Sequence, residues 1–318
     1  MSELTLPTIG YGAANVGNLF RALTDDEAWE ILQAAWDSGV RYFDTAPHYG
    51  LGLSERRLGA FLATKPRDQF VVSTKVGRVL EPHPEGADTL DDENNFAVPA
   101  DHKRVWDFSP EGIRASVEDS LERTGLDRFD VLYLHDPERH DLKEGIDVAL
   151  PALAGFRDQG MTRQIGVGSM DTDALLASAN SGVIDLLMVA GRYTLAEQPA
   201  LAEVVPACRA NGVGIVNASV FNSGLLAKDN PGDDARYEYG GVPAELLERV
   251  RVIAAVCHDF DVSLPAAALQ YTLRDDTVRS IVIGGSRPEQ VQQNAERMAE
   301  PIPADLWSAL TMKGLIPA

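Results

Sequence analysis

Short apolar runs recur along the chain, and most are rich in β-branched residues and end at glycine or a polar residue. Runs of this length and composition predict β-strands rather than helices. The predicted strands span residues 6–13, 40–46, 70–75, 130–135, 163–168, 184–190, 212–218 and 279–285. We therefore expect eight strands spread over the whole chain.

Segments with helical periodicity separate these strands. In TDDEAWEILQAAWDSG, residues 24–39, Thr24 and Glu27 form a capping box and Gly39 stops the helix. Other helical segments cover residues 109–125, 200–212 and 243–260. Strict alternation of strand and helix predicts an α/β fold with a parallel sheet, either open and doubly wound or closed into a barrel.

The segment after the first strand favours one of these two closures. An open sheet that binds a dinucleotide normally carries the spacing GxGxxG there. Residues 10–17, GYGAANVG, lack that spacing, and the next helix begins only near Thr24. Eight strand–helix units without the fingerprint predict one (β/α)8 TIM barrel domain over residues 1–318.

Two connections, residues 77–108 and 222–242, are longer than compact domains usually contain. Structureless segments of this length usually act as lids or binding loops. We expect both to lie over the mouth of the barrel, where the carboxyl ends of the strands meet.

Composition narrows the class of partner. With 45% hydrophobic and 24% charged residues, the 318-residue chain has material for a large core. A formal charge of −20 opposes binding to nucleic acid or anionic lipid, because both need clustered Lys and Arg.

No apolar stretch of about 18 residues and no signal-peptide pattern are present, so we expect a cytoplasmic protein. Cys208 and Cys257 lie in apolar helical patterns and are expected to be core thiols.

Polar residues end three successive predicted strands. Asp44 lies near the end of VRYFDTA, Lys75 ends FVVSTK, and His135 ends DVLYLH. Tyr49 follows Asp44 in a loop that contains glycines and a helix N-cap. In a barrel, the ends of the strands share one mouth, so we expect these four side chains to meet there.

The four residue types suit proton transfer at a carbonyl or an alcohol. A phenol has a pKa of about 10, and a neighbouring ammonium lowers it. Asp44 can keep Lys75 charged and oriented, and His135 can hydrogen-bond the reacting oxygen. One alternative remains at this point: an aldolase or isomerase that uses Lys75 as a Schiff-base amine.

The segments DTAPHYG, STK and LHD, in this order, resemble the catalytic signatures of the aldo-keto reductases, and the resemblance extends over almost the whole chain. It implies an eight-stranded barrel that binds NAD or NADP without a Rossmann domain. It also implies that Tyr49 transfers the proton, that Lys75 and Asp44 tune it, and that His135 orients the substrate oxygen. A regulatory protein that binds the nicotinamide cofactor without turnover is a further alternative.

Further segments resemble one branch of that superfamily, which contains aldose 1-dehydrogenases that act on L-fucose and related D-threo-aldoses, and pyridoxal 4-dehydrogenase. They are VWDFS, LHDPE, AGRYTL, VFNSGLLA, ARYEY and AAALQYTL. The branch implies oxidation of the anomeric carbon of an aldose to a lactone. Oxidation of pyridoxal, or general reduction of aldehydes and ketones, is the alternative.

The resemblance also implies a cofactor site. IVIGGSRPEQVQQN resembles the family's segment around the adenosine end, SVFNSGLL resembles the loop over the pyrophosphate, and Ser169 occupies a position from which the family contacts the carboxamide. The implied cofactor residues are Ser169, Ser219, Phe221, Asn222, Gly224, Leu225, Gly284, Ser286, Arg287, Gln290 and Asn294. Three positions depart from the family: Ala218 replaces a stacking aromatic residue, and Ser169 and Ala190 stand where many members hold the carboxamide with Asn and Gln.

Sugar sites combine aromatic faces with hydrogen-bond donors. The residues that we expect to contact the substrate are His48, Trp106, Phe108, Arg192 and Tyr237. We expect a small sugar or aldehyde as substrate and no metal ion, and the sequence sets no oligomeric state.

Overall fold

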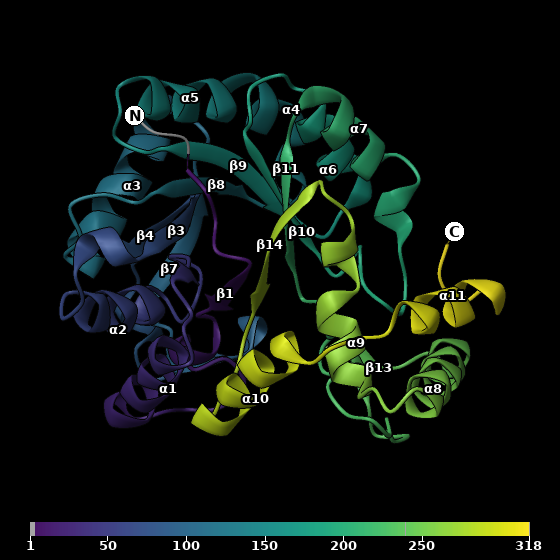
Figure 1. The fold of residues 1–318 in the computed structure, drawn as a ribbon. Helices are drawn as coiled ribbons and strands as arrows, with labels where there is room; N and C mark the ends of the chain where they lie inside the picture. The colour runs from purple at the N-terminus through teal and green to yellow at the C-terminus, as the bar shows by residue number, and fades with distance from the viewer. Residues whose placement is uncertain (1–3, 239, 318) are drawn as a thin grey trace.

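The computed structural model describes residues 4–238 and 240–317. Its parallel strands form a closed barrel in the order β1-β14-β11-β10-β9-β8-β3-β2 (Figure 1), which confirms the predicted (β/α)8 fold. The barrel strands are β1 (Ile9–Gly12), β2 (Tyr42–Asp44), β3 (Val71–Val76), β8 (Val131–His135), β9 (Gln164–Ser169), β10 (Leu186–Ala190), β11 (Gly214–Ala218) and β14 (Val278–Ile283).

Helices surround the barrel, and the predicted capping box is present, because Thr24 and Glu27 bond each other's backbone amides. Since β1 pairs with β14, the first and last parts of the chain meet, and α10 packs beside α1 (Figure 1). The helices are α1 (Asp25–Asp37), α2 (Leu53–Leu62), α3 (Pro110–Thr124), α4 (Leu142–Glu144), α5 (Leu150–Asp158), α6 (Thr172–Ala179), α7 (Val204–Asn211), α8 (Ala244–Asp259), α9 (Leu264–Gln270), α10 (Pro288–Ala299) and α11 (Ala304–Met312).

The barrel interior is a packed core. Tyr42 and Tyr133 fill its centre with aliphatic side chains from other strands, and Leu4 and Leu6 belong to the same cluster. A larger apolar layer lies between strands and helices and contains Cys208 and Cys257, both fully buried. Burial raises the pKa of both thiols to about 12, so they remain unreactive thiols, as the sequence predicts.

The expectation of a structureless segment at residues 77–108 is wrong. The chain there forms two antiparallel ribbons, β4 (Arg78–Pro82) with β7 (His102–Trp106) and β5 (Leu90–Asp91) with β6 (Phe96–Pro99). They pair because Phe96 and Val98 are buried against Leu51 beside the Tyr49 loop. The segment is therefore an ordered cover rather than a loose loop.

Residues 222–242 also contain a short ribbon, β12 (Arg236–Tyr237) paired with β13 (Gly240–Gly241). Tyr239, within the predicted ARYEY motif, lies outside the described residues. The ribbon is fastened to the barrel because Glu238 forms an ion pair with Arg192. The Tyr237 hydroxyl also donates a hydrogen bond of 2.5 Å to Glu197.

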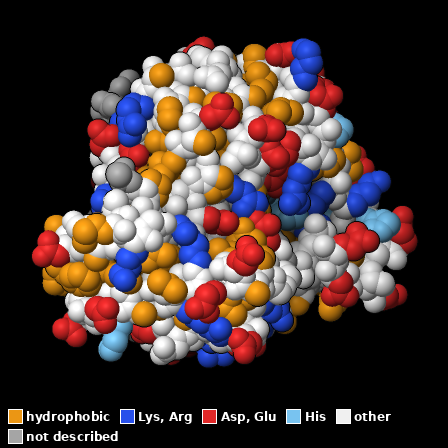
Figure 2. Space-filling model, turned by 90° about the vertical axis from the view of Figure 1, so that its right-hand side faces the viewer, with side chains coloured by type: hydrophobic (Ala, Val, Ile, Leu, Met, Phe, Trp, Pro, Cys, Tyr) orange, Lys and Arg blue, Asp and Glu red, His pale blue; other side chains and the backbone are white. Residues whose placement is uncertain are grey.

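Within residues 4–238 and 240–317, no single helix has the length and apolar composition to span a membrane, although the bent pair 244–259 and 264–274 passes that test together. On the face in Figure 2, Lys and Arg side chains are scattered among Asp and Glu side chains.

Candidate active site

The four predicted catalytic residues meet at one end of the barrel. The Lys75 ammonium donates hydrogen bonds to Asp44 Oδ2 at 2.6 Å and to the Tyr49 hydroxyl at 3.0 Å. The His135 ring lies 6.1 Å from the Tyr49 ring, centre to centre. Asp44 and Lys75 are each 2% exposed, so water competes little with their contact.

A buried chain of hydroxyl groups supports Asp44 from below, and sequence reasoning missed it. Ser73 donates a hydrogen bond of 2.7 Å to Asp44 Oδ1, and Tyr42 lies 3.0 Å from the Ser73 hydroxyl. Tyr133 lies 3.3 Å from the Tyr42 hydroxyl. The available signal was the spacing of Ser73 and Lys75, because alternate residues of a strand face the same side.

Burial has the largest effect on the pKa of Tyr49. It raises the pKa of Tyr49, and the favourable effect of Lys75 on the phenolate does not outweigh it. The expectation that the ammonium lowers this pKa overall is therefore wrong for the protein alone, although the ammonium does act in that direction. Burial alone would lower the pKa of Lys75, but Asp44 and Tyr49 raise it above its ordinary value. A raised lysine pKa opposes Schiff-base chemistry.

Two histidines flank the tyrosine as neutral rings. Burial, together with Arg78, lowers the pKa of His135 well below its ordinary value. Burial and Arg78 also lower the pKa of His48 to about 2. The Nδ1 atom of His48 is buried without a hydrogen-bond partner. The His48 ring lies beside the Tyr49 ring, where the sequence predicts contact with the substrate.

A second ion pair lies beside His135. Arg78, at the start of β4, donates to Asp136 at 2.5 Å, and Asp136 adopts a left-handed backbone conformation with φ of 43°. Such a conformation is unusual outside glycine and often occurs at functional sites. Asp136 belongs to the LHD segment, but no pattern in the sequence indicated a role for Arg78.

The segment around α10 gathers the residues expected at the adenosine end. Gly284, Arg287 and Gln290 are exposed, and no side chain caps the first turn of the helix. Gln290 instead accepts a hydrogen bond of 2.8 Å from the Ser286 amide. Asn294 is buried. Free amides at a helix start, beside exposed glycine, can hold phosphate.

Two residues from the loop after β1 reach this segment, and the sequence analysis did not assign them. Arg21 donates to the Ser286 carbonyl at 3.2 Å. A side chain on Gly284 would collide with Asn15 Oδ1 at 2.7 Å. The available signal was the closed barrel itself, because it brings the loops after the first and last strands together.

The turn after β11 contains the residues expected at the pyrophosphate. Ser219, Asn222 and Gly224 adopt positive φ values of 55°, 45° and 95°, so the turn exposes Ser219 and Gly224 but buries Asn222. Phe221 is partly buried against the core. The Leu225 side chain is 1% exposed and packs in the core, which removes it from side-chain contact with a cofactor.

The predicted substrate residues divide into different environments. Trp106 lies between the Arg78 guanidinium, 4.4 Å from its ring centre, and the His140 ring, stacked at 5.6 Å. Phe108 is 1% exposed and packs in the core. Arg192 and Tyr237 are partly buried and fasten the β12–β13 ribbon.

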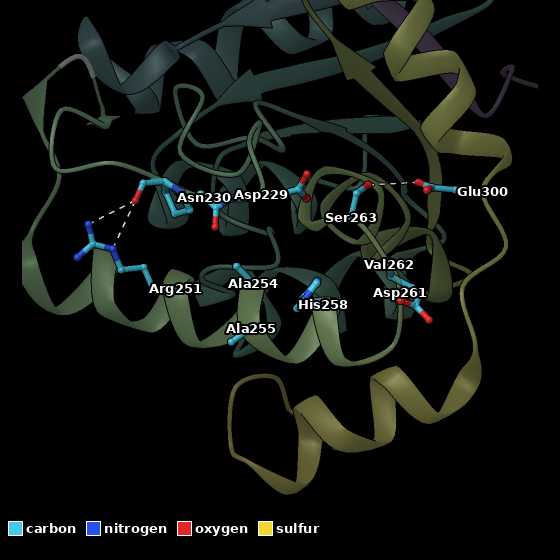
Figure 3. Close-up of a pocket in the computed structure, with 11 residues that line it drawn as sticks. Asp229, Asn230, Arg251, Ala254, Ala255, His258, Asp261, Val262, Ser263 and Glu300 are labelled. Atoms are coloured by element: carbon cyan, nitrogen blue, oxygen red, sulfur yellow. Dashed lines mark hydrogen bonds between the residues drawn. The ribbon is translucent and has the colours of Figure 1, made fainter.

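Two hollows occur near these elements. A small one of about 30 Å³ lies at the barrel mouth and is lined by Met170, Gly191, Arg192, Ser219, Asn222, Ser223 and Glu238. Another, of about 870 Å³, lies between α8, the start of α9 and residues 229–231, and includes none of the four catalytic candidates (Figure 3). In the described ranges, no group of three or more His, Cys, Asp or Glu is arranged to hold a metal ion.

The site fits a nicotinamide dinucleotide. The Glu138 Oε2 and Asn222 Oδ1 atoms are buried without partners at the ends of β8 and β11. Buried polar atoms normally find a hydrogen-bond partner, so these two acceptors are available to a polar ligand bound at the mouth. A dinucleotide that contacts the uncapped start of α10 and both of these atoms would cross the mouth from β14 towards β8.

Comparison with known proteins shows the family and the fold. The Aldo/keto reductase family profile matches residues 8–314. D-threo-aldose 1-dehydrogenase from a Pseudomonas species is 62% identical, across 99% of this chain and 96% of that protein. Pyridoxal 4-dehydrogenase from Microbacterium luteolum is 34% identical, across 98% and 95% respectively. The holo form of an aldo-keto reductase from Bacillus halodurans shares the fold, with a TM-score of 0.78 and 22% identity over 100% of this chain and 95% of that one.

Proposed function

We propose that this chain, which belongs to the aldo/keto reductase family of oxidoreductases, oxidises the anomeric carbon of an aldose to a lactone. L-Fucose and related D-threo-aldoses are the proposed substrates. The contact between Lys75 and Tyr49, at 3.0 Å, carries the proposal. The 62% identity to a D-threo-aldose 1-dehydrogenase across 99% of the chain supports the substrate class.

Tyr49 is the proposed proton acceptor. As the anomeric C–H bond breaks, the anomeric hydroxyl passes its proton to the Tyr49 oxygen and a C=O bond forms. A bound NAD or NADP would supply the hydride acceptor. Lys75 stabilises the phenolate that accepts the proton, and Asp44 keeps Lys75 charged. The neutral His135 ring orients the sugar oxygen by a hydrogen bond.

The two ribbons are the proposed covers of this reaction. Arg104 in β7 donates a hydrogen bond of 2.8 Å to the His48 carbonyl, beside Tyr49. On the opposite side, Glu238 joins Arg192 next to the small hollow at the mouth. Covers in these positions would keep water away during hydride transfer.

The direct test is the initial rate of appearance of reduced nicotinamide, with NAD or NADP, across L-fucose, D-arabinose, L-galactose and pyridoxal. The proposal predicts turnover with the aldoses. Turnover with pyridoxal alone would overturn it in favour of the activity named for the 34% identical relative. Absence of turnover with every pair would reject the substrate class.

A further inference from the structure

Glu138 is a partly buried side chain with an unpartnered acceptor atom that nothing in the proposed reaction uses. It lies in a 3-10 turn, Pro137–Arg139, directly after β8. One carboxylate oxygen, Oε1, accepts a hydrogen bond of 2.7 Å from the Ser169 hydroxyl at the end of β9. The other, Oε2, is buried and has no partner.

The Ser169 hydroxyl has only one proton, and Glu138 already accepts it. Its oxygen also accepts a hydrogen bond of 2.9 Å from the Asp171 amide. Ser169 can therefore offer a ligand only an oxygen lone pair, and the unsatisfied group of this pair is Glu138 Oε2. A carboxylate oxygen shielded from water needs a donor, and burial raises the pKa of Glu138 for the same reason.

Barrel order places this pair at the end of the cofactor path. The path starts at α10 after β14, passes the turn after β11, and reaches the hollow beside Met170 and Gly191, after β9 and β10. The next strand is β8, whose His135 pairs in register with Gly168 of β9. A nicotinamide ring that reaches the substrate held by Tyr49 and His135 therefore lies beside Ser169 and Glu138.

The nicotinamide ring carries one group that can donate a hydrogen bond, the amide NH2 of its carboxamide. Met170 and Ala190, at the ends of β9 and β10, have no side-chain amide that could bind this NH2 group. We infer that Glu138 Oε2 accepts the hydrogen bond from the carboxamide NH2 and so fixes the face of the nicotinamide ring. This inference rests on the proposed nicotinamide cofactor, but not on the identity of the sugar.

Cofactor binding without sugar tests the inference. The dissociation constants of reduced NAD and of its reduced 3-acetylpyridine analogue, which lacks the NH2 group, would be measured by fluorescence. The wild-type protein is expected to prefer the carboxamide by roughly 10- to 100-fold, as a hydrogen bond to a charged group implies. Glu138→Ala should weaken binding of the normal cofactor by that factor and leave the analogue nearly unchanged.

Two further variants keep the test independent of folding. Glu138→Gln keeps the shape and one oxygen acceptor without the charge, so its preference should fall between wild type and Glu138→Ala. Glu144→Ala removes a carboxylate that is 43% exposed and should retain the full preference. An equal preference in wild type and Glu138→Ala would overturn the inference. Failure of the wild-type protein to bind either dinucleotide would overturn both the inference and the proposed cofactor.

Discussion

The Lys75 ammonium lies 2.6 Å from Asp44 Oδ2, and only 3% of each side chain is exposed. A buried charge without its partner is strongly destabilising. This one contact therefore links stability to chemistry, because the same ammonium also donates to Tyr49 at 3.0 Å.

Lys75→Met should lower the free energy of unfolding by about 3–5 kcal/mol, because it leaves the Asp44 carboxylate buried and unpaired. Asp44→Asn combined with Lys75→Met should be more stable than Lys75→Met alone. Urea unfolding of the three proteins measures the difference. Equal stability of the single and double variants would show that the two groups are not coupled.

Tyr49→Phe should reduce kcat by roughly 10²- to 10⁴-fold, because it removes the proton acceptor and leaves the hydride path intact. The affinity for reduced cofactor should change less than about twofold, since the proposed cofactor path runs from β14 to β8 and does not include the phenol oxygen. Steady-state rates and a fluorescence titration measure the two effects. A variant with full turnover would remove Tyr49 from the reaction.

The oxidation rate should rise with pH. Burial raises the pKa of Tyr49, so the phenolate that accepts the proton forms only towards alkaline pH. We expect kcat to increase from about pH 7 to about pH 10, with no step near the ordinary histidine pKa of about 6.5. The second expectation follows because the pKa of His135 is lowered well below that value. A pH-independent kcat over this range would contradict the assignment.

Glu238→Gln should accelerate release of the reduced cofactor by about 1.5- to 5-fold, because it weakens the ion pair that fastens the β12–β13 ribbon to Arg192. Stopped-flow fluorescence measures the rate. Asp233→Asn is the matched control, since Asp233 belongs to the same segment but pairs with Arg251 on α8. Equal rates in both variants would mean that the ribbon does not hold the cofactor.

Much of this site could be predicted because its residues occupy the same position, the carboxyl end, of successive strands. Asp44, Lys75 and His135 each stand at or near the end of a strand, and a barrel brings such positions together. Strand positions were predicted well, since each strand is a short apolar run between glycines and polar residues.

Contacts between distant segments could not be predicted in this way. Arg21 meets Ser286 across 265 positions, and Glu138 meets Ser169 across 31. No local pattern marks such pairs. The ribbons at residues 78–106 were missed for a related reason, because their stability depends on burial of Phe96 and Val98 against the Tyr49 loop. The burial of Phe108 was not predicted either, because nothing local shows that an aromatic residue in a long connection packs into the core.

Transfer of deuterium tests the central claim most directly. The protein would be incubated with L-fucose deuterated at C1 and with oxidised cofactor, and the reduced cofactor analysed by mass spectrometry. The account predicts that the reduced cofactor gains one deuterium while the sugar becomes a lactone. Reduced cofactor that forms without deuterium would show that hydride does not come from the anomeric carbon and would contradict the account.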